Sequence, residues 1–355
     1  MKQLRLSRRE ALAAMGAGVA ALSFRAEAQA PRFLTRGVVL YPWDLSLEDW
    51  PERVKNTGLT TIGLHAGRRL DVMVDFVRSE RGQHFLSTCK ALGLGVEYEL
   101  HAVGELLSRE WFGSPAVDMF RMDNTGRRNP DCNCCPSSPE ALEKIAEKAV
   151  AFGDVLRPTT GRYFYWPDDG REWCFCPKCK GLSSSDQATL VENAMVEALR
   201  KHLDPKATLS HISYNMTLAP PKQVTPHEGL FLEFAPIARV YDRAIDDPGV
   251  TLNNADPEPK SHAAYLDILD ANLDVFGRET AQALEYWLDV SRISGWQRPS
   301  KKLPWHGDVV KADADAYAKR GIRHVTTFAT WIDADYIQRF GEPPLQDYAD
   351  ALLGA

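Results

Sequence analysis

The sequence lacks the short motifs that mark several large enzyme classes. It has no Gly-x-Ser-x-Gly motif of serine hydrolases, no phosphate-binding Gly-rich loop ending in Lys-Ser or Lys-Thr, and no His-Glu-x-x-His motif of zinc peptidases. It also has no long basic run, and its formal net charge of −6 argues against a nucleic-acid partner. What remains is an ordinary globular composition, with 44% hydrophobic and 25% charged residues.

The first thirty residues have the pattern of an export signal. Arg8 and Arg9 form a twin-arginine pair, the weakly apolar run 13–24 follows, and Ala28-Gln29-Ala30 offers a small-residue cleavage site. The apolar run is shorter than the ~20 residues that a membrane-spanning helix needs, so no anchor is expected after cleavage. The alternative is a short amphipathic helix of the domain. The pattern predicts export by the twin-arginine machinery to the periplasm or the exterior.

From residue 31 onwards, short β-rich runs alternate with longer amphipathic stretches. Eight strands are predicted at residues 38–41, 60–64, 96–100, 162–166, 207–214, 229–235, 283–288 and 324–329. The clearest helices are predicted at residues 46–56, 83–92, 139–156, 185–202, 263–276 and 309–319. The pattern predicts an α/β protein, a (β/α)₈ TIM barrel forming one domain over residues 31–355. An open doubly wound sheet is the alternative, but no Gly-x-Gly-x-x-Gly follows the first strand.

The longest irregular segment, residues 102–138, lies between the third strand and the helix that follows it. Loops of this length in a compact domain are usually functional. In a barrel this loop leaves the carboxyl ends of the strands, the face on which barrel enzymes carry their active sites.

Polar and aromatic residues cluster at the ends of the predicted strands. Taken singly, each of them could cap a loop or form a surface ion pair, so the prediction rests on the joint pattern. The candidates for binding a substrate are Tyr41, His65, His101, Asp168, Tyr214, Trp287 and Trp331.

Asp169 is the predicted general acid. It lies in Asp168-Asp169-Gly170 after the fourth strand. Adjacent residues of an extended segment point in opposite directions, so one carboxylate can enter the cleft while the other braces the turn. The alternative is an Asp-Gly turn without a catalytic role.

Two glutamates are candidates for the second acid. If Leu284 packs against the helices, strand alternation turns Glu285 toward the barrel interior beside Trp287. Glu233 on the sixth strand is the competing partner. Two carboxylates across one cleft are what glycosidic bond cleavage requires, because one protonates the leaving oxygen and the other attacks or activates water.

Six of the seven cysteines fall into two clusters. Cys174, Cys176 and Cys179 follow the fourth strand, and Cys132, Cys134 and Cys135 lie in the long loop before it. Three thiolates from the first cluster and Cys135 from the second predict a structural Cys₄ zinc site. Two disulfides drawn from the same cysteines are the alternative, since the protein is expected to be exported.

The chain resembles a bacterial family catalogued as a domain of unknown function, whose members are thought to be glycoside-hydrolase-like TIM barrels related to α-glucuronidases and β-hexosaminidases. The resemblance spans nearly all of the chain after the signal. It is carried by Cys135-Pro136-Ser137-Ser138-Pro139-Glu140, by Pro167-Asp168-Asp169-Gly170 with Cys174, Cys176 and Cys179, by Tyr214 with Pro220-Pro221, by Phe234-Ala235-Pro236 with Arg239, by Glu285-Tyr286-Trp287, and by Thr327-Phe328-Ala329 with Tyr336 and Pro343-Pro344. It implies a barrel, action on a carbohydrate, and a functional acid at Asp169.

The sequence therefore predicts an exported carbohydrate-active enzyme, a glycoside hydrolase with paired carboxylates. One alternative is a glycan-binding protein that uses the same cleft without catalysis. Another is a metal-dependent lyase or isomerase with His65, Glu99, His101 and Glu233 as ligands.

Overall fold

The computed structural model describes residues 31–67, 69–113 and 115–354. The predicted export signal, residues 1–30, lies outside the described residues. Residues 32–355 form one compact unit. None of the described helices combines the length and the apolar character required to cross a bilayer.

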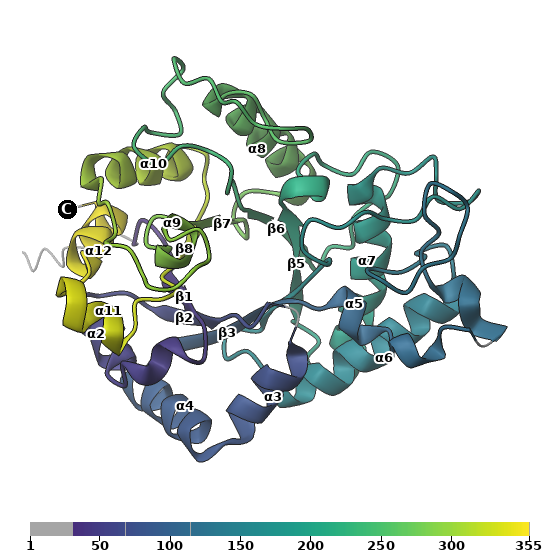
Figure 1. The fold of residues 1–355 in the computed structure, drawn as a ribbon, viewed down its shortest axis with the longest axis horizontal. Coiled ribbons are helices and arrows are strands. Elements are labelled where there is room, and N and C mark those ends of the chain that lie inside the picture. The colour runs from purple at the N-terminus through teal and green to yellow at the C-terminus, as the bar shows by residue number, and fades with distance from the viewer. Residues whose placement is uncertain (1–30, 68, 114, 355) are drawn as a thin grey trace, which may run out of the picture. The chain divides into compact units, whose positions relative to one another are not determined.

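Eight parallel strands close into a barrel in the order of the sequence, β1 to β8, with β8 pairing back to β1 (Figure 1). This confirms the predicted (β/α)₈ TIM barrel and excludes the open sheet. The strands are β1 (Thr35–Leu40), β2 (Thr61–Leu64), β3 (Gly95–His101), β4 (Arg162–Trp166), β5 (Thr208–Ser213), β6 (Leu230–Phe234), β7 (Gln282–Glu285) and β8 (His324–Phe328).

Helices surround the strands (Figure 1). They are α2 (Trp50–Asn56), α3 (Leu70–Arg78), α4 (Glu80–Leu92), α5 (Val103–Leu106), α6 (Pro139–Val155), α7 (Ser184–His202), α8 (His262–Phe276), α9 (Val290–Ile293), α10 (Gly307–Lys319), α11 (Ala334–Phe340) and α12 (Leu345–Leu353). The six helices predicted from periodicity are all present, whereas the helices α3, α5, α9, α11 and α12 were not predicted. Helix α2 begins at Trp50 rather than at the predicted residue 46, because Ser46 belongs to a preceding 3₁₀ turn.

Local sequence signals set several of the helix ends. Gly93 ends α4 in the left-handed conformation with φ +69°, which glycine adopts without a steric penalty. Ser138 caps α6 by accepting a bond from the backbone of Ala141, and Pro139 occupies the first turn of that helix. Helix α7 begins with a capping box between Ser183 and Asp186.

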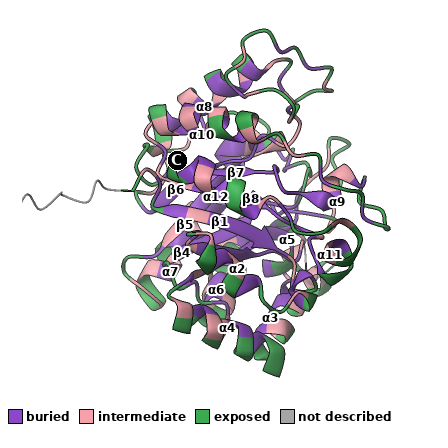
Figure 2. Cartoon of the chain, turned by 90° about the vertical axis from the view of Figure 1, so that its left-hand side faces the viewer, coloured by how far each residue is buried: buried purple, intermediate pink, exposed green. Residues whose placement is uncertain are grey.

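Strand alternation sorts the barrel residues into an outer and an inner set. The outer set packs against the helices in the main core, and the strands lie in the buried centre of the molecule (Figure 2). The inner set includes an aromatic and aliphatic cluster with Val39, Phe164, Phe231, Leu284 and Phe328. The inner residues at the carboxyl ends of the strands form the floor and walls of the candidate site.

A polar layer lies inside the barrel among the inner residues. Arg162 Nη2 donates to Gln282 Oε1 at 3.0 Å, and Gln282 Nε2 donates to Glu233 Oε1 at 3.0 Å. Glu97 and Glu99 are also fully buried in this polar layer. Burial raises the pKa of Glu233 to about 8, and burial with the nearby charge of Glu233 raises the pKa of Glu99 well above its usual value. Glu233 therefore favours the protonated form near neutral pH.

Candidate functional site

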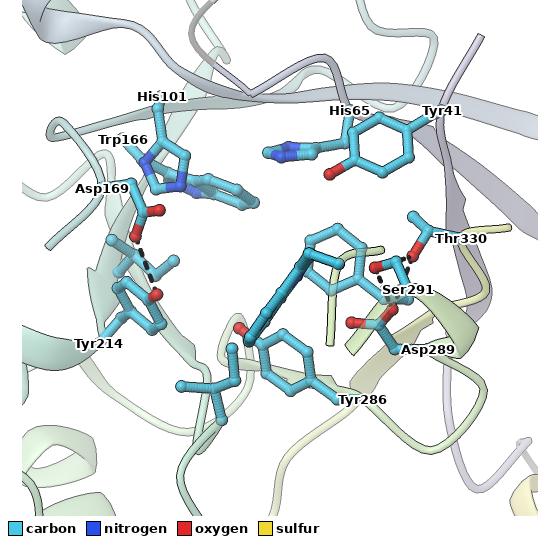
Figure 3. A pocket seen from close by; sticks show the side chains of 14 residues that line it. Tyr41, His65, His101, Trp166, Asp169, Tyr214, Tyr286, Asp289, Ser291 and Thr330 are labelled. Atoms are coloured by element: carbon cyan, nitrogen blue, oxygen red, sulfur yellow. Dashed lines mark hydrogen bonds between the residues drawn. The ribbon is translucent and has the colours of Figure 1, made fainter. Parts of the chain in front are cut away.

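A cavity of about 140 Å³ opens at the carboxyl ends of the strands, on the face where barrel enzymes hold their active sites (Figure 3). Its residues come from the ends of strands all around the barrel. They are Tyr41, His65, His101, Trp166, Asp169, Ile212, Tyr214, Ile237, Tyr286, Asp289, Ser291, Trp296, Phe328 and Thr330.

Asp169 reaches the cavity from the loop that follows β4. The hydroxyl of Tyr214, at the end of β5, donates to Asp169 Oδ1 at 2.9 Å. Burial raises the pKa of Tyr214, and the charge of Asp169 raises it further. The phenol therefore stays neutral and holds the exposed carboxyl group of Asp169 in one orientation.

Asp289 faces the same cavity from the other side, from the segment after β7 (Figure 3). Its Oδ1 accepts from Ser291 Oγ at 2.6 Å, from Thr330 Oγ1 at 2.7 Å and from the backbone N–H of Arg292 at 3.0 Å. The second oxygen, Oδ2, takes part in none of these three bonds. Three donors on one oxygen fix the rotamer of a buried carboxylate and replace water around its charge.

Two histidines line the cavity with their tautomers set by backbone carbonyls. His65 Nδ1 lies 2.6 Å from the carbonyl oxygen of Glu99, and His101 Nδ1 lies 2.6 Å from that of Pro167. A carbonyl oxygen only accepts, so each Nδ1 carries a proton. Burial lowers the pKa of His65 to about 3, and the neighbouring His101 lowers it too. His65 is therefore neutral, with Nε2 as a hydrogen-bond acceptor.

Aromatic rings form much of the cavity surface. Tyr286 stacks on Phe328 with ring centroids 5.2 Å apart, and Tyr41 stacks on Trp43 at 4.3 Å. Trp296 is 63% exposed at the edge of the cavity. Such rings can stack on the apolar face of a sugar while the polar groups bind its hydroxyls.

Five of the sequence-predicted site residues meet in this cavity: Tyr41, His65, His101, Asp169 and Tyr214. The signal that found them was their position at the ends of predicted strands. Side-chain alternation turns Tyr41, His65, His101 and Tyr214 inward rather than toward the helices, whereas Asp169 reaches the cavity from the loop beyond β4.

The predicted placement of Glu285 is wrong. Leu284 and Tyr286 belong to the inner cluster, so Glu285 points outward to the helices. There it lies in a buried ion pair with Arg239 at 3.2 Å and accepts a hydrogen bond from Tyr317 of α10. Trp287 also faces outward and donates through Nε1 to Asp313 at 3.0 Å, and it does not line this cavity.

Glu233 faces the barrel interior, as an inner residue of β6, but it lies outside the cavity lining. Its Oε2 accepts from Trp166 Nε1 at 2.7 Å, and the Trp166 ring is part of the cavity surface. Glu233 therefore supports Trp166 and does not reach a substrate directly. The prediction of a second catalytic acid at this position finds no support in the geometry.

Asp168 and Trp331 were also predicted to bind substrate, and both have structural contacts instead. Asp168 is buried and accepts from the backbone N–H groups of Asn133 at 2.7 Å and Gly104 at 3.2 Å. It thus braces the long loop while its neighbour Asp169 faces the cavity. Trp331 lies outside the cavity lining and stacks against the guanidinium of Arg298 at 4.4 Å.

Several cavity residues were not predicted from the sequence. Asp289 and Thr330 follow strands β7 and β8 but were not among the predicted site residues, and their mutual hydrogen bond links the segments after the two strands. Trp166 and Tyr286 were not chosen because aromatic residues in a strand are typical of core packing. Strand alternation was the signal available for Trp166, because it lies two residues after Phe164, an inner residue of β4.

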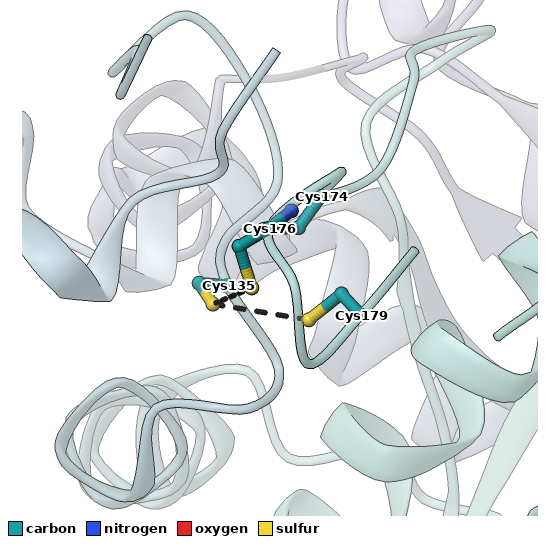
Figure 4. A group of neighbouring side chains, drawn as sticks. All are labelled: Cys135, Cys174, Cys176 and Cys179. Atoms are coloured by element: carbon teal, nitrogen blue, oxygen red, sulfur yellow. Dashed lines mark hydrogen bonds between the residues drawn. The ribbon is translucent and has the colours of Figure 1, made fainter. Parts of the chain in front are cut away.

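The predicted zinc ligands converge. Cys135, Cys174, Cys176 and Cys179 are buried, and their sulfur atoms all lie within 4.8 Å of one another (Figure 4). Among the described residues this is the one group of three or more metal-binding side chains that comes together. Among the described residues, the alternative ligand set of His65, Glu99, His101 and Glu233 does not come together as a metal-binding group.

The sequence profile described as "Domain of unknown function (DUF4838)" matches residues 29–255. A search of curated proteins finds no match to the chain. Two solved structures are similar in fold. The β-N-acetylhexosaminidase from Bacteroides fragilis NCTC 9343 has a TM-score of 0.54 and 11% identity, over 90% of this chain and 66% of that structure. The β-galactosidase from the psychrophilic Marinomonas ef1 has a TM-score of 0.51 and 12% identity, over 90% and 59%.

The chain spans 59–66% of the length of these two structures, and at such low identity the likeness concerns the fold. The profile match covers well over half of the chain. The chain therefore belongs to the family of the domain of unknown function DUF4838.

Proposed function

We propose that the protein is a glycoside hydrolase whose active site is the cavity at the carboxyl ends of the strands. One observation carries the proposal: Asp169 and Asp289 face a single aromatic-walled cavity from two sides. Paired carboxyl groups across a cleft are the minimum machinery for cleaving a glycosidic bond. The structural neighbours support it, since a β-N-acetylhexosaminidase and a β-galactosidase have the same barrel.

In this proposal Asp169 is the general acid. It is the more exposed of the two groups, and its protonated oxygen can be delivered to the leaving glycosidic oxygen. The hydroxyl of Tyr214 orients the group through Oδ1. Proton transfer of this kind contributes on the order of 10²–10⁴ to the rate.

Asp289 is the second acid, acting on the anomeric carbon as a nucleophile or through a water molecule. The bonds from Ser291, Thr330 and the Arg292 backbone fix its orientation before the substrate arrives. A preorganised carboxylate also stabilises the positive charge that develops on the sugar ring in the transition state.

The remaining lining residues bind the sugar. His65 offers Nε2 as an acceptor for a hydroxyl, and the hydroxyl of Tyr41 is a donor on the neighbouring strand. Trp296 offers an exposed ring for stacking at the edge of the cavity. Binding of this kind fixes the glycosidic oxygen near Asp169.

We also propose that the protein acts outside the cytoplasm, in the periplasm or the exterior. The support is the sequence pattern of Arg8, Arg9 and the apolar run 13–24. Replacing both arginines by lysine in the full chain should leave the protein in the cytoplasm, measured by cell fractionation. Unchanged export of that variant would contradict twin-arginine transport.

The enzymatic proposal is tested with a panel of aryl glycosides, including hexosaminides, galactosides and glucuronides. Hydrolysis of at least one by the wild type is expected, with a loss of about 10²–10⁴-fold in Asp169→Asn and in Asp289→Asn. Asp75→Asn on the exposed face of α3 is the matched control and should retain full activity. Sugar binding without turnover in any of these proteins would instead identify a glycan-binding protein.

A further inference from the structure

We infer that the four-cysteine cluster binds one zinc ion that joins the two loops carrying the acid side of the cavity. Cys135 Sγ lies 3.8 Å from Cys176 Sγ and 3.9 Å from Cys179 Sγ. A tetrahedral zinc site with Zn–S bonds of about 2.3 Å places its sulfurs about 3.8 Å apart. These two separations match those of sulfur ligands around one ion, and all four sulfurs lie within 4.8 Å of one another.

Disulfides explain this arrangement less well. A disulfide needs two sulfurs at about 2.0 Å, and two separate bridges have no reason to bring all four sulfurs together. All seven cysteines of the described chain are free, and Cys132 and Cys134 lie in the same loop outside the cluster. The spacing of Cys174, Cys176 and Cys179 suits ligands of one ion contributed by a single turn.

The surroundings of the sulfurs stabilise thiolates. Cys174 Sγ accepts from the backbone N–H groups of Met122 at 3.3 Å and Cys176 at 3.5 Å. The hydroxyl of Ser137 lies 2.9 Å from Cys179 Sγ. Four thiolates around Zn²⁺ carry a net charge of −2, and a partly buried guanidinium, that of Arg128, lies 3.8 Å from Cys174 Sγ. Neutral disulfides would need neither the donors nor the cation.

Four sulfur ligands leave no open coordination position, so the ion is structural. It ties the loop between β3 and α6, which contains Cys135, to the loop between β4 and α7. Two residues before Cys135, Asn133 exchanges two hydrogen bonds with Asp168, at 2.7 and 2.9 Å. Asp168 directly precedes Asp169, so a short rigid path runs from the ion to the proposed general acid.

Metal content tests the inference on the full chain, purified in zinc-containing buffer without chelator and then dialysed. Elemental analysis should find about one zinc per chain in the wild type and in Cys132→Ser, a matched buried cysteine outside the cluster. Cys176→Ser should lose most of the zinc. Iron in place of zinc, or equal zinc in both variants, would overturn the assignment.

A second measurement avoids reliance on a variant that fails to fold. Titrating the native wild type with a mercurial thiol reagent should release zinc in step with modification of the cluster, as read by a metallochromic dye. A thiol count below seven in denaturant without reductant would show disulfides and overturn the metal site.

The effect of the ion on Asp169 rests on the proposed function, whereas the metal content does not. The apoprotein should unfold at a lower temperature and lose turnover by a fall in kcat larger than the change in KM. Zinc binding without any hydrolysis would retain this inference and refute the enzyme. Full activity and stability of the apoprotein would refute the role of the ion in positioning Asp169.

Discussion

Replacing Glu285 should damage stability and leave chemistry intact, although this residue was the first sequence candidate for the second acid. The side chain is fully buried and bonded to Arg239 and Tyr317. Glu285→Leu leaves the phenol of Tyr317 without an acceptor and removes one of the two carboxylates that balance Arg239; the other is Asp313. Losing one partner of a buried ion pair costs about 3–5 kcal/mol. In a domain of this size that loss lowers the unfolding temperature by on the order of 10 °C.

Thermal and urea unfolding measure this cost, with Glu279→Gln on the exposed surface as the control. The isosteric Glu285→Gln retains an acceptor for Tyr317 and should keep wild-type turnover within about threefold. The reasoning is refuted if Glu285→Gln is as stable as the wild type but loses turnover as severely as Asp169→Asn. That result would place Glu285 in the active site rather than on the helix-facing side of the barrel.

Three further predictions follow from burial and contacts. Burial raises the pKa of Glu233 and of Asp44 to about 8, so the folded state holds these protons more tightly than the unfolded state. Stability should therefore fall as the pH rises from about 4.5, near the ordinary pKa of these carboxyls, to about 8. The expected loss is about 1.4 kcal/mol per pH unit for each group, and Glu233→Gln should reduce this slope as measured by urea unfolding. The lowered pKa of His65, about 3, means that its contribution to stability is lost as the pH falls below about 6.5, so a stability maximum at mildly acidic pH is expected and a maximum above pH 8 would contradict it. Trp296→Ala should raise KM about threefold to tenfold with little change in kcat, and a change in kcat alone would exclude a stacking role. Asp168→Ala removes the acceptor of two buried backbone N–H groups and should cost about 3 kcal/mol in urea unfolding, whereas an unaffected unfolding midpoint would contradict the bracing role.

The fold could be predicted from the sequence because the barrel repeats one local pattern of strand and helix eight times. The predicted strand at residues 162–166 coincides with β4, because four aromatic residues follow Arg162 between a turn at Gly161 and Pro167. Gly93 and Ser138 are local end signals that need no tertiary partner. Helices α3, α11 and α12 were missed because their short apolar stripes resemble loop sequence until the barrel supplies a surface to pack on.

The site could be predicted only in part, because the sequence does not fix the direction in which each side chain points. Tyr41, His65 and Asp169 could be placed at strand ends from the sequence. The direction of Glu285 could not, because it depends on Arg239 and on α10, which are far apart in the sequence. Local alternation offers two equal choices, and the distant ion pair selects one of them. No local sequence pattern predicted that the hydrogen bonds to Asp289 would come from two different segments of the chain.

A leaving-group comparison tests the central claim, that Asp169 protonates the departing oxygen of a glycoside held in the cavity. It compares kcat/KM for the phenyl and the 2,4-dinitrophenyl glycoside of whichever sugar the wild type hydrolyses, in the wild type, Asp169→Asn and Asp289→Asn. Because dinitrophenolate leaves without a proton, Asp169→Asn should lose about 10²–10⁴-fold on the phenyl substrate and far less on the dinitrophenyl one. Asp289→Asn should lose heavily on both. Equal losses of Asp169→Asn on the two substrates, or no hydrolysis by the wild type, would contradict the account.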